Sequence, residues 1–170
     1  DLSGNPIGYL FDLKLLPTLK TLDLSSTYIS QVPPGFLDLP ELHKVTLRDN
    51  LITELPEAMF ELPQGRTRGF DFAANPLSIE SRNRIKTYFR ETSHDFEVPA
   101  DPFDIELARQ LFPALDEQGA SDMIYGLPGT LAQGRNQLRH WRAERETLRS
   151  ELSAWTTQSS ATHPVTGEQR

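Results

Sequence analysis

The chain of 170 residues contains no cysteine. Disulfide bonds, thiolate-bound zinc and cysteine nucleophiles all need a thiol, so the sequence excludes these three kinds of site. Any thiol chemistry connected with this chain must therefore be carried by residues outside it.

Long apolar runs and an excess of positive charge are also absent. No stretch approaches the roughly 20 apolar residues of a membrane-spanning helix, so we expect a soluble chain without a membrane span. Lys and Arg number 17 against 24 Asp and Glu, and the net charge of −7 argues against a nucleic-acid partner. The chain begins at Asp1 with neither an initiator Met nor a signal segment, so we expect a piece of a longer protein.

No pattern typical of an enzyme site is present. The four histidines, His43, His94, His140 and His163, are too scattered for a metal-binding motif. The sequence also lacks the nucleophile-elbow, phosphate-loop and dinucleotide-binding motifs. We therefore predict no catalytic residue, no metal site and no cofactor in this chain, which we do not expect to be an enzyme.

An internal repeat occupies residues 1–77. Its copies share a polar position that is separated by 22, 23 and 25 residues, namely Asn5, Thr27, Asn50 and Asn75. The residues aligned around that position in the three longer copies are Leu19, Leu22, Leu24 and Ile29; Leu42, Val45, Leu47 and Ile52; and Thr67, Phe70, Phe72 and Leu77. Period, apolar pattern and polar position together resemble the leucine-rich repeat, LxxLxLxxNxL.

The repeat predicts an α/β leucine-rich-repeat solenoid. Alternation in Leu22-Asp23-Leu24 and Val45-Thr46-Leu47 predicts short parallel strands with one buried face. Prolines in the return segments disfavour long helices, so the convex side should be irregular, with short helical or 3₁₀ turns. The resemblance implies that the Asn amide bonds the turn after each strand, and Thr27 should leave its turn less completely bonded.

The rest of the chain is predicted to be helical. Ser78 should cap a helix whose Ile85, Tyr88 and Phe89 close the last repeat, and Asp101-Pro102 should start another helix. We expect a C-terminal capping helix followed by a small α-helical bundle. The predicted divisions are leucine-rich repeats, truncated N-terminally, at 1–77, a capping helix at 78–91, a linker at 92–103, a helical connector at 104–156 and a disordered tail at 157–170.

Apolar residues in two columns at seven-residue spacing characterise the last helix. One column holds Leu131, Leu138 and Leu152, interrupted by Arg145, and the other holds Trp141, Leu148 and Trp155. This spacing predicts about 25 helical residues packed along a partner helix. We expect both tryptophans to pack between connector helices, the alternative being an exposed docking seam. Arg145 should either reach solvent or pair with Glu106, Asp116 or Asp122.

The polar residues between the buried strand positions form a candidate binding surface. In the expected register, Asp1, Asp23, Thr46 and Asp71 form one column, Ser3, Ser25, Arg48 and Ala73 the next, with Thr21, Lys44 and Gly69 beside them. Concave faces of solenoids are extended binding sites. The predicted partner-binding residues are Thr21, Asp23, Ser25, Lys44, Thr46, Arg48 and Asp71. There are two alternatives. The first is that these residues are polar only because this face is exposed to solvent. The second is that the partner binds mainly to repeats upstream of this chain.

The helical half resembles a more specific group. Ala108-Arg109-Gln110-Leu111-Phe112-Pro113, Asp116-Glu117-Gln118 and the run from Arg145 to Trp155 resemble a helical connector of large bacterial, Pseudomonas-like leucine-rich-repeat effectors. Those proteins carry a NEL-type ubiquitin-ligase domain downstream, with its catalytic cysteine in a Cys-x-Asp motif. The resemblance implies that this chain precedes a cysteine-dependent domain.

Three functions follow from these patterns. The leading hypothesis is protein recognition by the concave face, with the connector leading to a downstream domain that the repeats can contact. The alternative is the substrate-recognition and regulatory part of a secreted bacterial NEL-type ubiquitin ligase. The third makes residues 104–156 an oligomerising coiled coil. For location we expect secretion from bacteria, into the host cytoplasm in the effector hypothesis, and otherwise a soluble cytoplasmic protein.

Overall fold

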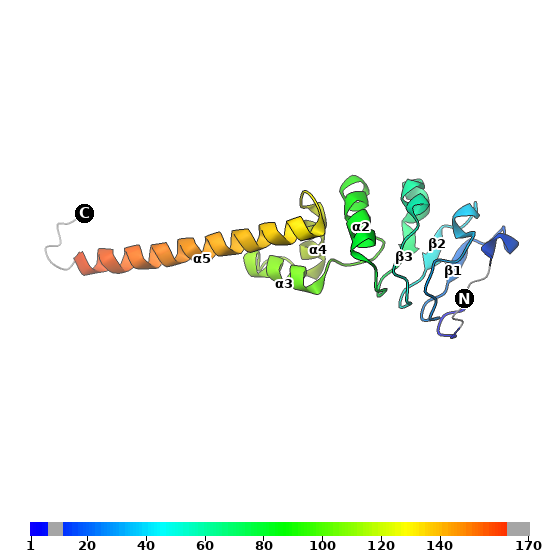
Figure 1. The fold of residues 1–170 in the computed structure, drawn as a ribbon, viewed down its shortest axis with the longest axis horizontal. Helices are drawn as coiled ribbons and strands as arrows, with labels where there is room; N and C mark the ends of the chain where they lie inside the picture. Colours follow the sequence, from blue (N-terminus) through cyan, green and yellow to red (C-terminus); the bar gives the residue numbers. More distant parts are fainter. Residues whose placement is uncertain (7–11, 163–170) are drawn as a thin grey trace.

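The computed structural model describes residues 1–6 and 12–162. The described chain is elongated: small strands lie at one end, helices follow, and one long helix projects at the other end (Figure 1). The described elements are η1 (Leu13–Leu15), β1 (Thr21–Asp23), η2 (Phe36–Asp38), β2 (Lys44–Thr46), η3 (Glu57–Glu61), α1 (Gln64–Thr67), β3 (Gly69–Asp71), α2 (Ile79–Thr92), α3 (Pro102–Leu111), α4 (Glu117–Gly126) and α5 (Leu131–Thr162).

The three strands form a parallel sheet in the order β1-β2-β3. Their middle residues, Leu22, Val45 and Phe70, are aligned with one another and buried. Alternation along each strand places the neighbouring polar residues on the opposite face. The sheet with its helical returns confirms the predicted α/β leucine-rich-repeat-like arrangement, whereas the complete solenoid and its cap stay predictions.

Short helical turns return the chain between strands, as the prolines predict. They are the 3₁₀ turns η1, η2 and η3, together with α1. Phe36 and Met59 from two of these turns are buried in the same core as the strand residues. β3 also requires its glycine, because a Cβ on Gly69 would overlap the carbonyl oxygen of His43.

Asparagine side chains link consecutive repeats. The Asn50 amide donates to the carbonyl oxygens of Leu47 in its own repeat and Leu24 in the preceding one, at 3.0 and 2.9 Å. Asn75 repeats this geometry one unit later, donating to Phe72 and Leu47. The resemblance to leucine-rich repeats implies this role, and the bonds confirm it.

Thr27 departs from the pattern but keeps part of the bonding. Its hydroxyl donates to the Leu24 carbonyl, and Asn50 Oδ1 accepts hydrogen bonds from the backbone N–H groups of Thr27 and Ile29. Within its own turn the Asn50 amide donates to the carbonyls of Leu47 and Arg48, whereas within the turn at Thr27 the hydroxyl donates to the Leu24 carbonyl alone in the described structure. The turn at Thr27 is therefore less completely bonded than the turns with asparagine, as predicted.

Helix α2 begins where the sequence predicts. The Ser78 hydroxyl accepts from the Ser81 N–H at 3.1 Å, which confirms the N-cap, and Ile85 and Tyr88 are buried. The segment that follows is packed against the core: Phe96 is fully buried, and its carbonyl accepts from Phe72 N–H at 2.9 Å. This bond extends the inter-repeat ladder by one step beyond β3.

Helices α3, α4 and α5 pack against one another. Asp101 caps α3 with Pro102 as its first residue, as predicted. Buried Asp104 on α3 accepts two hydrogen bonds from the Arg135 guanidinium on α5. This ion pair fixes α3 alongside the first half of α5.

The expectation that both tryptophans pack between connector helices is wrong for Trp155. Leu138 is buried and Trp141 half-buried, but Leu148, Leu152 and Trp155 are 58, 64 and 66% exposed, because α3 ends before the helix reaches them.

Arg145 pairs with no carboxylate within the described chain. Its guanidinium instead donates to the carbonyl oxygens of Leu111 and Gln110, which are left free at the C-terminal end of α3. The helix itself runs to Thr162, beyond the expected start of a disordered tail at 157, and residues 163–170 lie outside the described part.

Candidate protein-binding surface

The sheet aligns the predicted binding residues in columns. Thr21 lies beside Lys44, and Asp23 beside Thr46, which in turn is paired with Asp71. We call the surface formed by all seven predicted residues the strand face; it consists of Thr21, Asp23, Ser25, Lys44, Thr46, Arg48 and Asp71. All seven side chains are half-buried or exposed, so the strand register brings the predicted set together.

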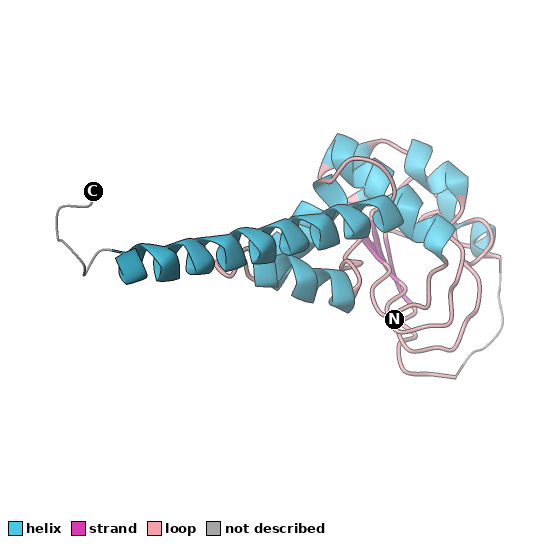
Figure 2. Cartoon of the chain, turned by 60° about the vertical axis from the view of Figure 1, so that its left-hand side comes forward, coloured by secondary structure: helices cyan, strands magenta, loops and turns pink. Residues whose placement is uncertain are grey.

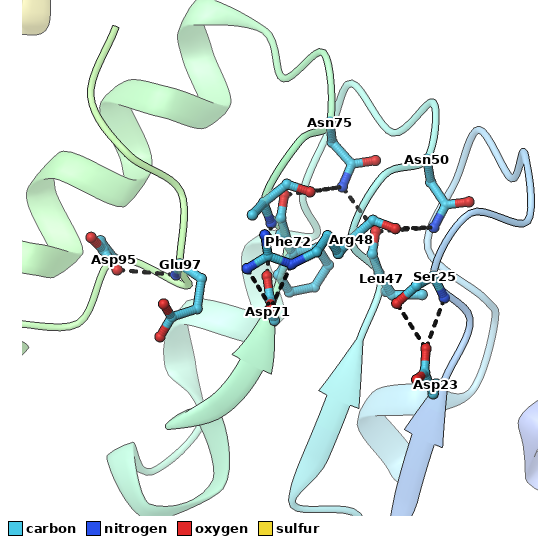
Figure 3. A network of polar contacts seen from close by, with 11 residues as sticks. Asp23, Ser25, Leu47, Arg48, Asn50, Asp71, Phe72, Asn75, Asp95 and Glu97 are labelled. Atoms are coloured by element: carbon cyan, nitrogen blue, oxygen red, sulfur yellow. Dashed lines mark hydrogen bonds and ion pairs between the residues drawn. The ribbon is translucent and has the colours of Figure 1, made fainter. Parts of the chain in front are cut away.

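The aspartates of the strand face also have a structural role. Oδ1 of Asp23 accepts from the Ser25 N–H at 3.0 Å and from the Ser25 hydroxyl at 2.8 Å. Oδ1 of Asp71 accepts from the Ala73 N–H at 3.0 Å in the same way. Each carboxylate thus stabilises the turn after its strand, a role that the sequence reasoning missed, although the spacing of two residues recurs (Figure 3).

One half of the strand face is paired internally. The Arg48 guanidinium donates from Nε and Nη2 to Asp71 Oδ2 at 3.1 and 3.0 Å (Figure 3). Because the charges of these two side chains neutralise each other, they offer a partner less unpaired charge than the sequence suggests.

The other half of the strand face is hollowed. A shallow cavity of about 240 Å³ is lined by Asp1, Thr21, Leu22, Asp23, Lys44 and Thr46. Its polar lining residues are the acidic Asp1 and Asp23, the basic Lys44, and two threonines. These groups can accept from, donate to and position a polar protein surface.

Asp23 is held in its charged form. The backbone N–H of Ser25, with a smaller contribution from the serine hydroxyl, lowers the pKa of Asp23 below its ordinary value, although partial burial opposes this shift. Asp23 Oδ1 accepts these bonds, so Oδ2 is the carboxylate oxygen that remains for other hydrogen bonds. Asp23 therefore contributes a negative charge to the hollow at neutral pH.

A second hollow, which the sequence did not indicate, lies where the repeats meet the helices. It measures about 430 Å³ and is lined by Arg48, Ala73, Ala74, Asp95, Glu97, Pro99 and Gln118. Burial raises the pKa of Asp95, whose Oδ1 accepts from the Glu97 N–H at 3.0 Å. In the sequence, only the acidic residues of the predicted linker indicate this hollow. That signal is not specific, because linkers commonly carry acidic residues on their surface.

The described residues contain no group of three or more side chains suited to a metal ion. His94 contacts the Thr67 carbonyl at 2.9 Å, and His140 contacts Glu144 at 3.1 Å on the same helix face. His163 lies outside the described residues. Within the described part of the chain, no helix has the combination of length and apolar character needed to cross a membrane.

Comparison with known proteins finds a partial relative. The U2 small nuclear ribonucleoprotein A' of Mycosarcoma maydis is 35% identical over 85 residues, a match that covers 49% of this chain and 35% of that protein. The match supports a leucine-rich-repeat protein. No protein-family model matches the chain, and no solved structure matches it significantly.

The match to this relative supports the leucine-rich repeats but not the resemblance to bacterial effectors. This chain spans about a third of its length, and its printed name denotes no enzymatic activity. Leucine-rich repeats favour protein partners, in agreement with the strand face. The relative is eukaryotic, and nothing in the comparisons supports the resemblance to bacterial effectors with a NEL-type ligase domain.

Proposed function

We propose that this chain is a protein-recognition segment that binds its partner on the strand face. The observation that carries the proposal is the hollow between β1 and β2, where the strand register aligns Asp23, Lys44 and Thr46 with both signs of charge. A repeat protein needs no deep cavity to bind another protein, because its recognition surface extends over successive repeats.

The hollow is the centre of the proposed surface. Asp23 keeps one carboxylate oxygen for a cationic or N–H donor of the partner, and the exposed Lys44 ammonium can donate to a carboxylate or carbonyl. Arg48 and Asp71 are bonded to each other, so we assign them to the rim. The partner is thus a protein surface that places a donor and an acceptor on neighbouring repeats.

Photo-crosslinking tests where a partner lies. A photoreactive residue replaces Thr46 on the strand face or, as a control, exposed Glu61 on the return side. The proposal predicts that proteins of the source cell crosslink to position 46 and not to position 61. Equal crosslinking of the same proteins at both positions would overturn the proposal.

The role of the helices as a connector stays a prediction. In this proposal, residues 104–156 join the repeats to a downstream domain that can also contact them. The ion pair between Asp104 and Arg135 supports a rigid start to such a connector, because it ties α3 to α5.

The ubiquitin-ligase hypothesis depends on the resemblance of the helical runs alone. In that hypothesis the segment recognises substrates and regulates a secreted bacterial ligase, with the parent protein acting in the host cytoplasm. The reading frame of the parent gene tests it directly. A helical domain with a Cys-x-Asp motif after Arg170 would support the hypothesis, and a frame without such a cysteine would refute it.

A further inference from the structure

The second half of α5 has no packing partner within the described chain. All residues from 143 to 157 are exposed, and the helix projects beyond α3 in both views (Figures 1 and 2). An isolated helix of this length is marginally stable in water, because most helix stability in proteins comes from packing of an apolar face. The exposed part is therefore expected to be covered in its working state.

An apolar seam continues from the packed half of α5 into the exposed half. Its members alternate at spacings of three and four residues, and they are Leu138, Trp141, Arg145, Leu148, Leu152 and Trp155. The first two pack into the core against neighbouring helices, whereas Leu148, Leu152 and Trp155 are more than half exposed. Because this spacing is that of a coiled-coil seam, the exposed residues continue an existing interface.

The charged residues beside the seam indicate which partner helix packs against it. Arg142 and Arg149 lie along one edge of the seam, and Glu144 and Glu151 along the other. In a parallel pair of identical helices, Glu144 of one copy faces Arg149 of the other, five residues further along, and the reverse pair forms by symmetry. An antiparallel pair centred on the exposed residues would instead bring Glu151 against its own copy.

We propose that the exposed part of α5 pairs with the same part of a second copy in a parallel two-stranded coiled coil. Leu148, Leu152 and Trp155 form its core. Arg145 does not enter this core, because its guanidinium is bound to the carbonyl oxygens at the end of α3, so the apolar contacts begin at Leu148 and Glu144 lies at the edge of the pair. This proposal is independent of partner binding on the strand face.

The small apolar area of the seam predicts that the two copies associate weakly. Three apolar side chains per copy bury well below the ~800 Å² per partner that is typical of stable complexes. The monomer and dimer therefore exchange as concentration changes, and mass measured at one dilute concentration is not decisive.

Sedimentation equilibrium over a wide concentration range tests the seam. The wild-type chain should shift from monomer to dimer as concentration rises. Leu152→Lys places a charge inside the seam and should raise the dimer dissociation constant at least about tenfold. Ser150→Lys adds the same side chain on the outward face of α5 and should leave the constant unchanged. A wild-type chain that stays monomeric throughout, or a Leu152→Lys variant that dimerises equally well, overturns the proposal.

A charge exchange tests the orientation. Glu144→Arg alone should weaken the dimer, because Arg then faces Arg149 of the other copy. Combining it with Arg149→Glu restores opposite charges in a parallel pair and should restore the dissociation constant. A double variant as weak as the single one overturns the parallel arrangement. Circular dichroism confirms that each variant keeps the helix content of the wild type.

Discussion

Single side chains at one repeated position hold the repeats together. Asn50 Oδ1 accepts from two buried backbone N–H groups of the preceding repeat, on Thr27 and Ile29, whereas Asn75 Oδ1 accepts from one, on Ile52. Two of the carbonyls that these amides bind have a second donor: the Leu47 carbonyl accepts from both asparagines, and the Leu24 carbonyl also accepts from the Thr27 hydroxyl. The Phe72 carbonyl accepts from Asn75 alone within the described residues. Removing Asn50 therefore unpairs two buried N–H groups, whereas removing Asn75 unpairs one N–H group and one carbonyl, and proteins tolerate an unpaired carbonyl more readily than an unpaired N–H.

Asn50→Ala should lower the free energy of unfolding more than Asn75→Ala does. A buried donor left without an acceptor costs about 1–3 kcal/mol, so two of them should make Asn50→Ala about 3 kcal/mol destabilising. Chemical denaturation of the two variants and the wild type measures the difference. A loss for Asn75→Ala that equals or exceeds the loss for Asn50→Ala would contradict this assignment.

Lys86 should make the free energy of unfolding depend on pH in the alkaline range. It is 1% exposed and donates to the Leu127 carbonyl, and burial, with a contribution from Arg90, lowers the pKa of Lys86. Between that lowered pKa and the ordinary value of about 10.4, the unfolded chain binds more protons than the folded one. The free energy of unfolding of the wild type should therefore rise with pH in this range, relative to Lys86→Met.

Denaturation from neutral pH to about pH 10 measures this difference. Lys86→Met is the matched reference, because the remaining titrating groups are common to both proteins. Parallel pH profiles would show that Lys86 is charged as easily in the folded chain as in the unfolded one.

At the scale of elements, one ion pair joins α3 to α5. The Asp104 side chain is 3% exposed and is bound by the Arg135 guanidinium, which also stacks on the Phe103 ring at 5.2 Å. Hydrogen bonding to Asp104 raises the pKa of Arg135, so the guanidinium stays charged. Arg139 stacks on the same ring at 5.4 Å without a bond to Asp104, which makes it a matched control.

Arg135→Ala should destabilise the fold by about 3 kcal/mol or more, because it leaves a buried carboxylate without its cation. Arg139→Ala should cost less than about 1 kcal/mol, since it removes an exposed stacking contact only. Adding Asp104→Asn to Arg135→Ala should recover part of the loss by removing the buried charge. Thermal unfolding gives all three values, and equal losses for Arg135→Ala and Arg139→Ala would refute the role of the ion pair.

The sequence predicts the helices and strands better than it predicts whether their side chains are buried or exposed. The Ser78 and Asp101 caps and the aligned strand columns follow from local patterns, because capping and alternation are set by neighbouring residues. The exposure of Trp155 could not be predicted in this way. Its seven-residue spacing from Leu148 is the same whether a partner helix is present or not, and only the end of α3 decides it.

The sequence predicts the position of the strand face, but only part of its chemistry, and its role in binding stays a prediction. Strand alternation places Asp23, Arg48 and Asp71 on one face, but it does not reveal that Arg48 and Asp71 pair with each other. The hollow beside Asp95 was missed because it joins residues from the repeats, the linker and α4, which are distant in sequence.

The whole molecule presents two surfaces at opposite ends. The strand face lies at the repeat end, and the exposed seam of α5 projects from the helical end (Figure 1). Dimerisation through α5 would place two strand faces in one assembly, so a partner with two copies of its epitope would bind with increased avidity. The strand face remains the central claim, because the proposed recognition of a partner depends on it.

The affinity of the crosslinked partner for three forms of the chain tests that claim most directly. The forms are the wild type, a variant with Asp23→Ala, Lys44→Ala and Thr46→Ala in the hollow, and a return-side variant with Glu61→Ala and Gln64→Ala. The hollow variant should bind at least about tenfold more weakly, a loss of roughly 1.4 kcal/mol, while the return-side variant binds like the wild type. Unchanged affinity of a folded hollow variant would contradict recognition by the strand face.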